Sequence, residues 1–242
     1  MSNLLTKFAI IADPHYYSET LGNTGKAYER RAGSDQKMLA QSRGTILAAL
    51  ELIKNSDAKF LLIAGDLSND GERVSHEEMR EILYEFKKIM PVYVITATHD
   101  WCCDGNPRRY EGDKIYHDVE TIPPEELAEF YKGFGVSDAV STFYTHQNKV
   151  SYVVRPCDGV SIFCLDDDQD GYGSSGYSDE HFNWIAEQVN EAKKRGDVVF
   201  GMQHHHLFLT ELQRAINGKG SVDHRINQCT KFANIDFPVM FT

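Results

Sequence analysis

The sequence has few cysteines, no long apolar run and no recognisable leader, and each shortage excludes a class of protein. Its five cysteines include no CxxC pair, and an odd number cannot form a fully paired disulfide framework. No apolar run approaches the ~18 residues that a membrane span requires. The apolar stretch 8–12 is too short for the core of a signal peptide. We therefore expect a protein of the reducing cytoplasm without a membrane anchor.

Positive charge is also scarce. The chain has 25 Lys and Arg against 36 Asp and Glu, a formal net charge of −11. A nucleic-acid groove needs clustered basic side chains that displace counterions from the phosphates, so this balance argues against one. A small phosphorylated ligand, held by a metal or a local basic patch, remains compatible with it.

Linkers, internal repeats and low-complexity tracts are absent as well, and 242 residues can bury a large core within one domain. What is present is a series of short apolar runs rich in β-branched and aromatic residues. Most are apolar on both sides, which is typical of strands covered on both faces of a sheet in an α/β protein. The predicted strands are 8–11, 60–64, 92–97, 151–154, 160–165, 198–202 and 238–241.

Helical periodicity separates several of these strands. Apolar residues recur at helical spacing over 79–89 and 182–192, and 38–53 is rich in Ala and Leu. The segments 16–35 and 100–121 are polar, contain glycine and show no clear period. We interpret both as long loops, which in compact domains are usually functional or mobile.

Residues that bind metals or transfer protons follow four of the predicted strands. Because ligands bind outside the carboxyl ends of the strands in open α/β sheets, we expect these side chains to converge at one edge. Taken singly, each Asp could be a turn or capping residue and each His a hydrogen-bonded structural residue. Four such coincidences favour a site. The residues are Asp13, His15, Asp66, His99, Asp100 and His204.

The mixture of carboxylates and imidazoles predicts a divalent metal centre. Carboxylate oxygen and imidazole nitrogen together suit Zn, Mn, Fe or Ni. Asp66 follows a glycine, which lets the chain approach closely, and its carboxylate could bridge two cations. Two cations ~3.5 to 4 Å apart can clamp the attacking and leaving oxygens of a displacement on phosphorus.

These residues resemble the motifs of the calcineurin-like metallophosphoesterases. Asp13-Pro14-His15 looks like the DxH motif, Gly65-Asp66 like GDxx, and 97–100 (ATHD) like an altered GNHD. His204 is similar to a histidine that follows a later strand, and 65–78 and 179–206 also look like bacterial members. The resemblance covers essentially the whole chain. It implies one domain over 1–242 with a four-layer α/β/β/α sandwich, two packed sheets flanked by helices.

The resemblance also implies roles for individual residues. Asp13, His15 and Asp66 would hold a first metal ion, and Asp66 would bridge to a second held by Thr98 and His204. His99 would contact the phosphate and protonate the leaving oxygen. Asp100 would orient the imidazole of His99. His205 is the alternative to His204, because neighbouring residues of a strand project to opposite faces.

Two departures from the family pattern qualify this interpretation. Thr98 stands where the family has Asn, and a hydroxyl is a poorer neutral ligand than an amide oxygen. A GHxH motif normally follows a strand such as 237–242, where this sequence stops, so we expect a chain that is truncated or that has drifted from efficient catalysis.

The predicted function is metal-dependent hydrolysis of a phosphate monoester or diester with one or two divalent ions. Metal-activated water would attack phosphorus while His99 assists the leaving oxygen. The expected partner is a small phosphorylated substrate. The alternative is a catalytically impaired relative that binds a metal or a phosphorylated ligand without turnover.

Other features receive weaker interpretations. Four arginines in the two long segments could grip a phosphate, although solvated surface charge is the commoner state of any one of them. Cys102 and Cys103 are expected to be inert thiols. The segment 76–80 (HEEMR) lacks the second His of a HExxH zinc motif, and we expect an exposed helix start there. The arginines are Arg30, Arg31, Arg108 and Arg109.

Overall fold

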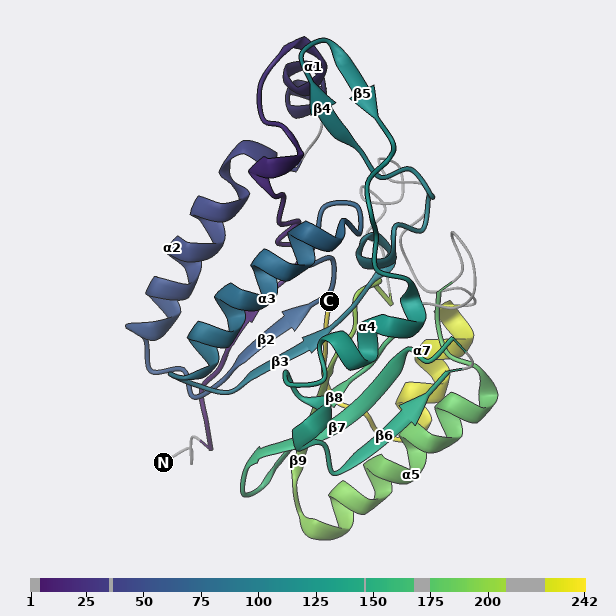
Figure 1. Cartoon of the computed structure of the whole chain (residues 1–242). Coiled ribbons are helices and arrows are strands. Elements are labelled where there is room, and N and C mark those ends of the chain that lie inside the picture. The colour runs from purple at the N-terminus through teal and green to yellow at the C-terminus, as the bar shows by residue number, and fades with distance from the viewer. Residues whose placement is uncertain (1–4, 35–36, 146, 168–174, 208–224) are drawn as a thin grey trace.

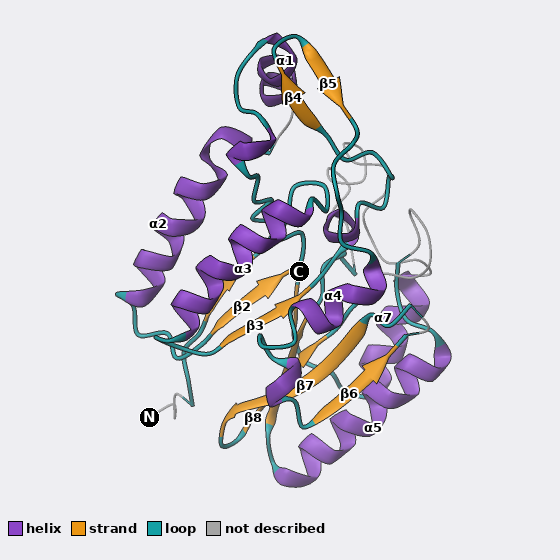
Figure 2. Cartoon of the chain, viewed as in Figure 1, coloured by secondary structure: helices purple, strands orange, loops and turns teal. Residues whose placement is uncertain are grey.

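Two sheets lie face to face at the centre of the molecule, and helices cover the outer face of each (Figures 1 and 2). The predicted four-layer α/β/β/α sandwich is therefore confirmed. The structure is a computed structural model, and it describes residues 5–34, 37–145, 147–167, 175–207 and 225–242.

The first sheet contains three parallel strands in the order β1-β2-β3. Its central strand is buried along its whole length, because alternate side chains enter different cores. Leu61 and Ile63 pack against the helices outside, whereas Leu62 and Ala64 pack against the second sheet. The elements are β1 (Ala9–Ile11), β2 (Leu61–Ala64), β3 (Val92–Ile95), α2 (Ser42–Lys54) and α3 (Arg73–Lys87).

The second sheet has five strands in the order β10-β9-β8-β7-β6. Strands β10, β9 and β8 run parallel to one another. Strand β7 is antiparallel to β8, and β6 is antiparallel to β7. Ile185 and Val189 pack on its outer face against Phe163. The elements are β6 (Ser141–Tyr144), β7 (Val150–Cys157), β8 (Val160–Cys164), β9 (Val198–Met202), β10 (Met240–Phe241), α5 (Asp179–Arg195) and α7 (Arg225–Asn234).

All seven predicted strands are present, with ends displaced by at most a few residues, and so are the three predicted helices. The sequence interpretation missed β6, α7 and the short helix α4 (Pro124–Phe130). Strand β6 alternates between half-buried and exposed residues, as an edge strand does, so it lacks the continuous apolar run used for the others. No helix within the described ranges is both long and apolar enough to span a bilayer.

The prediction that 16–35 and 100–121 are loops is wrong. They contain helix α1 (Lys26–Ser34) and the hairpin of β4 (Arg109–Glu111) and β5 (Lys114–Tyr116). We call the parts that pack together, residues 17–34 and 106–118, the cap; its helix and hairpin project beyond the sheets at the top of Figure 1. The rings of Tyr28 and Tyr110 meet edge to face at 5.6 Å in its small core. Such short elements bury too few side chains to leave a periodic signal.

The expectation of an exposed helix start at 76–80 is also wrong, because His76 is fully buried in α3. Its Nε2–H donates to the carbonyl of Asp100 at 2.7 Å, and its Nδ1 accepts the hydroxyl of Tyr131 at 2.8 Å. Burial lowers the pKa of His76 to about 4, so the ring is neutral at neutral pH. His76 thereby ties α3 and the end of α4 to the turn that follows β3.

The turn after β2 requires a glycine. Gly65 adopts φ +83°, and a Cβ there would lie 2.7 Å from the Cβ of Ala97 and 3.0 Å from Nδ1 of His204. The glycine therefore lets the segments after β2, β3 and β9 meet.

We predict that Gly65→Ala lowers the free energy of unfolding by about 2 to 4 kcal/mol, because the left-handed backbone and the contacts of the new Cβ both cost energy. Gly159→Ala is the matched control, since Gly159 has φ +79° and nothing within 4 Å of the added Cβ. It should lose only about 1 to 2 kcal/mol. Equal losses in urea denaturation would contradict the close approach at Gly65.

Candidate active site

The ends of β1 and β2 turn sharply and remain paired through the turn. Asp13, His15 and Asp66 have φ values of 51°, 42° and 50°, a left-handed backbone that costs a non-glycine residue about 1 to 2 kcal/mol. The N–H of His15 donates to the carbonyl of Asp66 at 2.9 Å, and Tyr16 and Leu67 pair in the same way at 2.8 Å. Strain at three neighbouring residues that carry polar side chains is typical of a functional site.

These three strained residues bring their ligand atoms together. One potential ligand atom from each lies within 4.8 Å of those of the other two. His15 Nε2 stands 3.8 Å from Asp13 Oδ1 and 3.7 Å from Asp66 Oδ2. These distances are too long for good hydrogen bonds, but ligands bonded at about 2.1 Å to one ion stand about 3 to 4 Å apart. The donor set and its spacing therefore fit a divalent cation.

His204 reaches this cluster from the other sheet, where it follows β9. Its Nδ1–H donates to the carbonyl of Ala64 at 3.0 Å, which leaves Nε2 directed at Asp66 Oδ2, 3.3 Å away. A backbone hydrogen bond on one ring nitrogen is the usual way in which a metal-binding imidazole is oriented. Of the two histidines that the sequence left open, His204 faces the cluster, whereas His205 lies 3.4 Å from Asp167.

Asp167 was missed by the sequence interpretation. It is buried just beyond β8, and its two carboxylate oxygens accept the N–H groups of His204 and His205 at 3.2 and 2.9 Å. It therefore fixes the backbone that presents His204. Its signal in the sequence was an acid two residues beyond the end of a predicted apolar strand, which is also the position of Asp66.

The electrostatics of the cluster favour a cation. Burial opposes ionisation of Asp66, but the hydrogen bond and charge of His204, helped by His99 and His15, lower its pKa well below the usual range. Burial also opposes protonation of His204, yet Asp66 raises the pKa of His204 well above its usual value. Burial raises the pKa of Asp13. The negative potential that holds a proton on His204 also attracts a metal ion.

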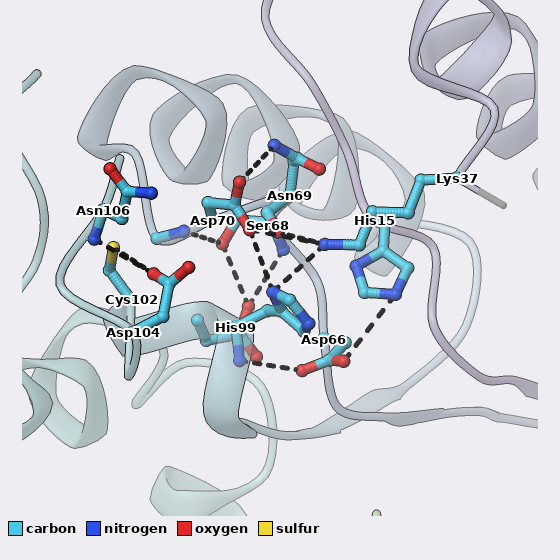
Figure 3. Close-up of polar contacts among 12 residues, drawn as sticks. His15, Lys37, Asp66, Ser68, Asn69, Asp70, His99, Cys102, Asp104 and Asn106 are labelled. Atoms are coloured by element: carbon cyan, nitrogen blue, oxygen red, sulfur yellow. Dashed lines mark hydrogen bonds and ion pairs between the residues drawn. The ribbon is translucent and has the colours of Figure 1, made fainter. Parts of the chain in front are cut away.

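His99 lies beside the cluster, with its ring edge to face against His15 at 5.1 Å (Figure 3). Its Nδ1–H donates to Asp70 Oδ1 at 3.0 Å, and the ammonium of Lys37 lies 3.0 Å from the same nitrogen. Burial lowers the pKa of His99, but the bond to Asp70 and the charge of Asp66 outweigh it and leave the pKa raised. The orienting carboxylate of this imidazole is therefore Asp70.

The prediction that Asp100 orients His99 is thus wrong. The carboxylate of Asp100 is fully buried and accepts the N–H groups of Ala97 and Ser68, each at 2.9 Å, and the hydroxyl of Ser68 at 3.2 Å. Burial and the nearby charge of Asp66 raise its pKa to about 7. Asp100 holds the turns after β2 and β3 against each other, and so positions the N–H of His99, which donates to Asp66 Oδ1 at 3.1 Å.

Thr98 begins the short helix Thr98–Trp101 that carries His99. Its carbonyl accepts the N–H of Cys103 at 3.1 Å. The ligand role expected of its hydroxyl stays a prediction. Cys102 is buried, and burial raises the pKa of its thiol to about 12, in agreement with an inert side chain.

The structure separates the four arginines of the long segments. Arg108 reaches the site, where its Nη1 donates to Asp70 Oδ2 at 2.9 Å, and Arg31 Nη2 stands 3.8 Å from the same oxygen. Arg109 instead pairs with Asp118 on the surface of the cap, and Arg30 is exposed on α1. The long segments therefore do bring arginines to the site.

A cleft of about 670 Å³ opens over this arrangement. Its polar wall is formed by Asp13, His15, Lys37, Asp66 and His99. Its other wall is lined mainly by apolar residues of β1 and α2, such as Ile11 and Ile46. Lys37 left no signal in the sequence, because it lies in a polar stretch far along the chain from every other member of the wall.

Comparison with known proteins agrees with this geometry. Residues 6–234 match the calcineurin-like phosphoesterase family (Metallophos). Among solved structures, the fold is similar to that of a dimetal phosphatase from Danio rerio, with a TM-score of 0.53 and 11% identity over 88% of this chain and 77% of that one. No curated protein sequence matches the chain. Since the family match covers almost its entire length, the chain belongs to the calcineurin-like phosphoesterases.

Proposed function

We propose that this chain is a metal-dependent phosphoesterase that hydrolyses a phosphate monoester or diester. One observation carries the proposal: carboxylates and imidazoles from both sheets converge on Asp66, and His99 stands next to them on the wall of a cleft. Membership of the family supports the reaction class. The dimetal phosphatase of similar fold supports the need for metal ions.

The proposed ligands divide between two cations. Asp13, His15 and Asp66 would hold the first, and Asp66, His204 and Thr98 the second. Asp66 Oδ2 faces His15 Nε2 on one side and His204 Nε2 on the other, which supports a bridging role for this oxygen. Mn, Zn, Fe and Ni all suit such a donor set. Bound there, the ions would polarise the phosphoryl group and lower the pKa of water.

His99 would act on the leaving oxygen. Because Asp70 accepts from Nδ1, the ring is held with Nε2 as its second nitrogen, available to the substrate. A proton on Nε2 can then pass to the departing oxygen. The N–H of His99 is fixed by Asp66, so the imidazole keeps its place relative to the cations.

A single position favours the rival interpretation, in which the protein binds a metal or a phosphorylated ligand without turnover. Thr98 offers a hydroxyl where an amide oxygen would bind a cation better. A weakened second site would lower the rate without abolishing the fold. The rival is therefore tested at this residue.

The first test is turnover. We predict that the protein hydrolyses 4-nitrophenyl phosphate or bis(4-nitrophenyl) phosphate with added Mn²⁺, and that EDTA removes the activity. Asp66→Asn and His204→Asn should lower kcat/KM more than about 100-fold, because each removes a ligand. His205→Asn is the matched control and should retain most of the activity. Metal-independent turnover, or a larger loss in His205→Asn than in His204→Asn, would contradict the assignment.

The second test concerns Thr98. We predict that Thr98→Asn tightens binding of the second Mn²⁺ and raises kcat several-fold, because an amide oxygen replaces a hydroxyl. Thr98→Val has almost the same shape without the hydroxyl, and should weaken the same binding step. Calorimetric titration with Mn²⁺ separates the two sites. Identical titrations for wild type and both variants would show that Thr98 is not a ligand.

A further inference from the structure

Cationic side chains from three separate segments converge on Asp70. Lys37 Nζ lies 3.4 Å from Oδ1, Arg108 Nη1 lies 2.9 Å from Oδ2, and Arg31 Nη2 lies 3.8 Å from Oδ2. His99 donates to Oδ1 as well. The side chain of Asp70 is 3% exposed, and those of Lys37 and Arg108 are 10% and 19% exposed. One carboxylate thus gathers three cations and an imidazole beside the proposed site; Figure 3 shows Lys37 and His99 of this group next to Asp70.

The cap brings the two arginines to this place. Arg31 lies on α1, and Arg108 directly precedes β4. The two parts of the cap pack closely against each other: the backbone at Gly22 lies so near the carbonyl of Tyr110 that an added Cβ would overlap it. The arginines are therefore carried by a packed structure rather than by loose chain.

The cationic side chains differ in how close they come to the metal cluster. Lys37 and His99 share the wall of the cleft with Asp13 and Asp66 and approach Oδ1 of Asp70. Arg31 and Arg108 approach the other oxygen, Oδ2, and are not among the residues that line that cleft. The carboxylate of Asp70 therefore separates the two arginines from the cleft and the proposed metal ions, whereas Lys37 lines the cleft itself.

Placing three partly buried cationic side chains so close together costs free energy. Partly burying a guanidinium costs solvation energy, and partners besides Asp70 offset part of this cost: Arg108 Nη2 lies 3.7 Å from Asp104 Oδ2, and Lys37 Nζ donates to the carbonyl of Asn69 at 2.7 Å. In a chain with a formal net charge of −11, the overall field also repels anionic ligands. A local cluster of Arg and Lys beside the reacting centre offsets that repulsion, and guanidinium groups bind phosphate and carboxylate oxygens in a defined geometry.

We propose that Arg108 and Arg31, with Lys37 between them and the cleft, form a subsite for a second anionic group on the substrate. The substrate would carry a phosphate or a carboxylate in addition to the phosphoryl group that is hydrolysed. The arginines exchange part of their pairing with Asp70 for this group. The inference rests on the proposed phosphoesterase function, and it adds the class of substrate.

The test compares three related compounds in Mn²⁺. Glycerol 3-phosphate has one anionic group, 3-phosphoglycerate adds a carboxylate, and glycerol 1,3-bisphosphate adds a phosphate. We expect wild type to show at least about tenfold higher kcat/KM for one of the last two. Arg108→Gln should lower that value about 10- to 100-fold, and the value for glycerol 3-phosphate by much less. Arg109→Gln, one residue along and paired with Asp118, is the matched control and should keep the preference.

Each outcome decides the proposal. The preferred compound identifies the second group as carboxylate or phosphate. A wild type without preference, or an Arg108→Gln variant that loses equally on all three compounds, would overturn the subsite, since Arg108 would then serve the scissile phosphoryl or the fold. The proposed function fails only if the two 4-nitrophenyl esters are not hydrolysed either; if they are hydrolysed and these three compounds are not, calorimetric binding of the three compounds still tests the subsite. Equal or absent binding would overturn it too.

Discussion

The placement of Asp66 is the constraint on which the rest of the site depends. Its carboxylate is almost completely buried and lies between His15 from the first sheet and His204 from the second, and it accepts the N–H of His99. Such a charge is stable in the interior only when it is surrounded by hydrogen-bond donors or cations. The sandwich meets this requirement by ending β1, β2, β3 and β9 around a single point. The strained backbones of Asp13, His15 and Asp66 are the cost of that convergence.

Around Asp66, three other buried carboxylates have different tasks. Asp70 holds the imidazole of His99, Asp100 joins two turns through their backbone N–H groups, and Asp167 fixes the backbone of His204. Their pKa values diverge accordingly. Burial acts against the ionisation of all three, but His99 and nearby cations lower the pKa of Asp70 to about 2, whereas Asp66 helps to raise that of Asp100 to about 7. The surroundings of each carboxylate, rather than its residue type, set its charge.

The sequence predicted those parts of the structure that are encoded locally. Continuous apolar runs indicated the strands, and the acids and histidines that follow them, such as Asp13, Asp66 and His204, converge as expected. The predictions that failed concern features that depend on tertiary contacts. The cap was missed because its short helix and hairpin are stabilised by each other, and Asp70 and Lys37 acquire a role only once distant segments meet. The role of Asp100 beside His99 was implied by the family resemblance, whereas its carboxylate accepts hydrogen bonds from the neighbouring turn instead.

The account is tested most directly by locating the metal ions. A crystal grown with Mn²⁺ and measured by anomalous scattering should show one ion bonded to Asp13, His15 and Asp66, and a second, of equal or lower occupancy, bonded to Asp66 and His204. Asp66 should be the ligand common to both. An anomalous map with no peak at Asp66, or with Mn²⁺ bound only elsewhere on the acidic surface, would contradict the proposed centre.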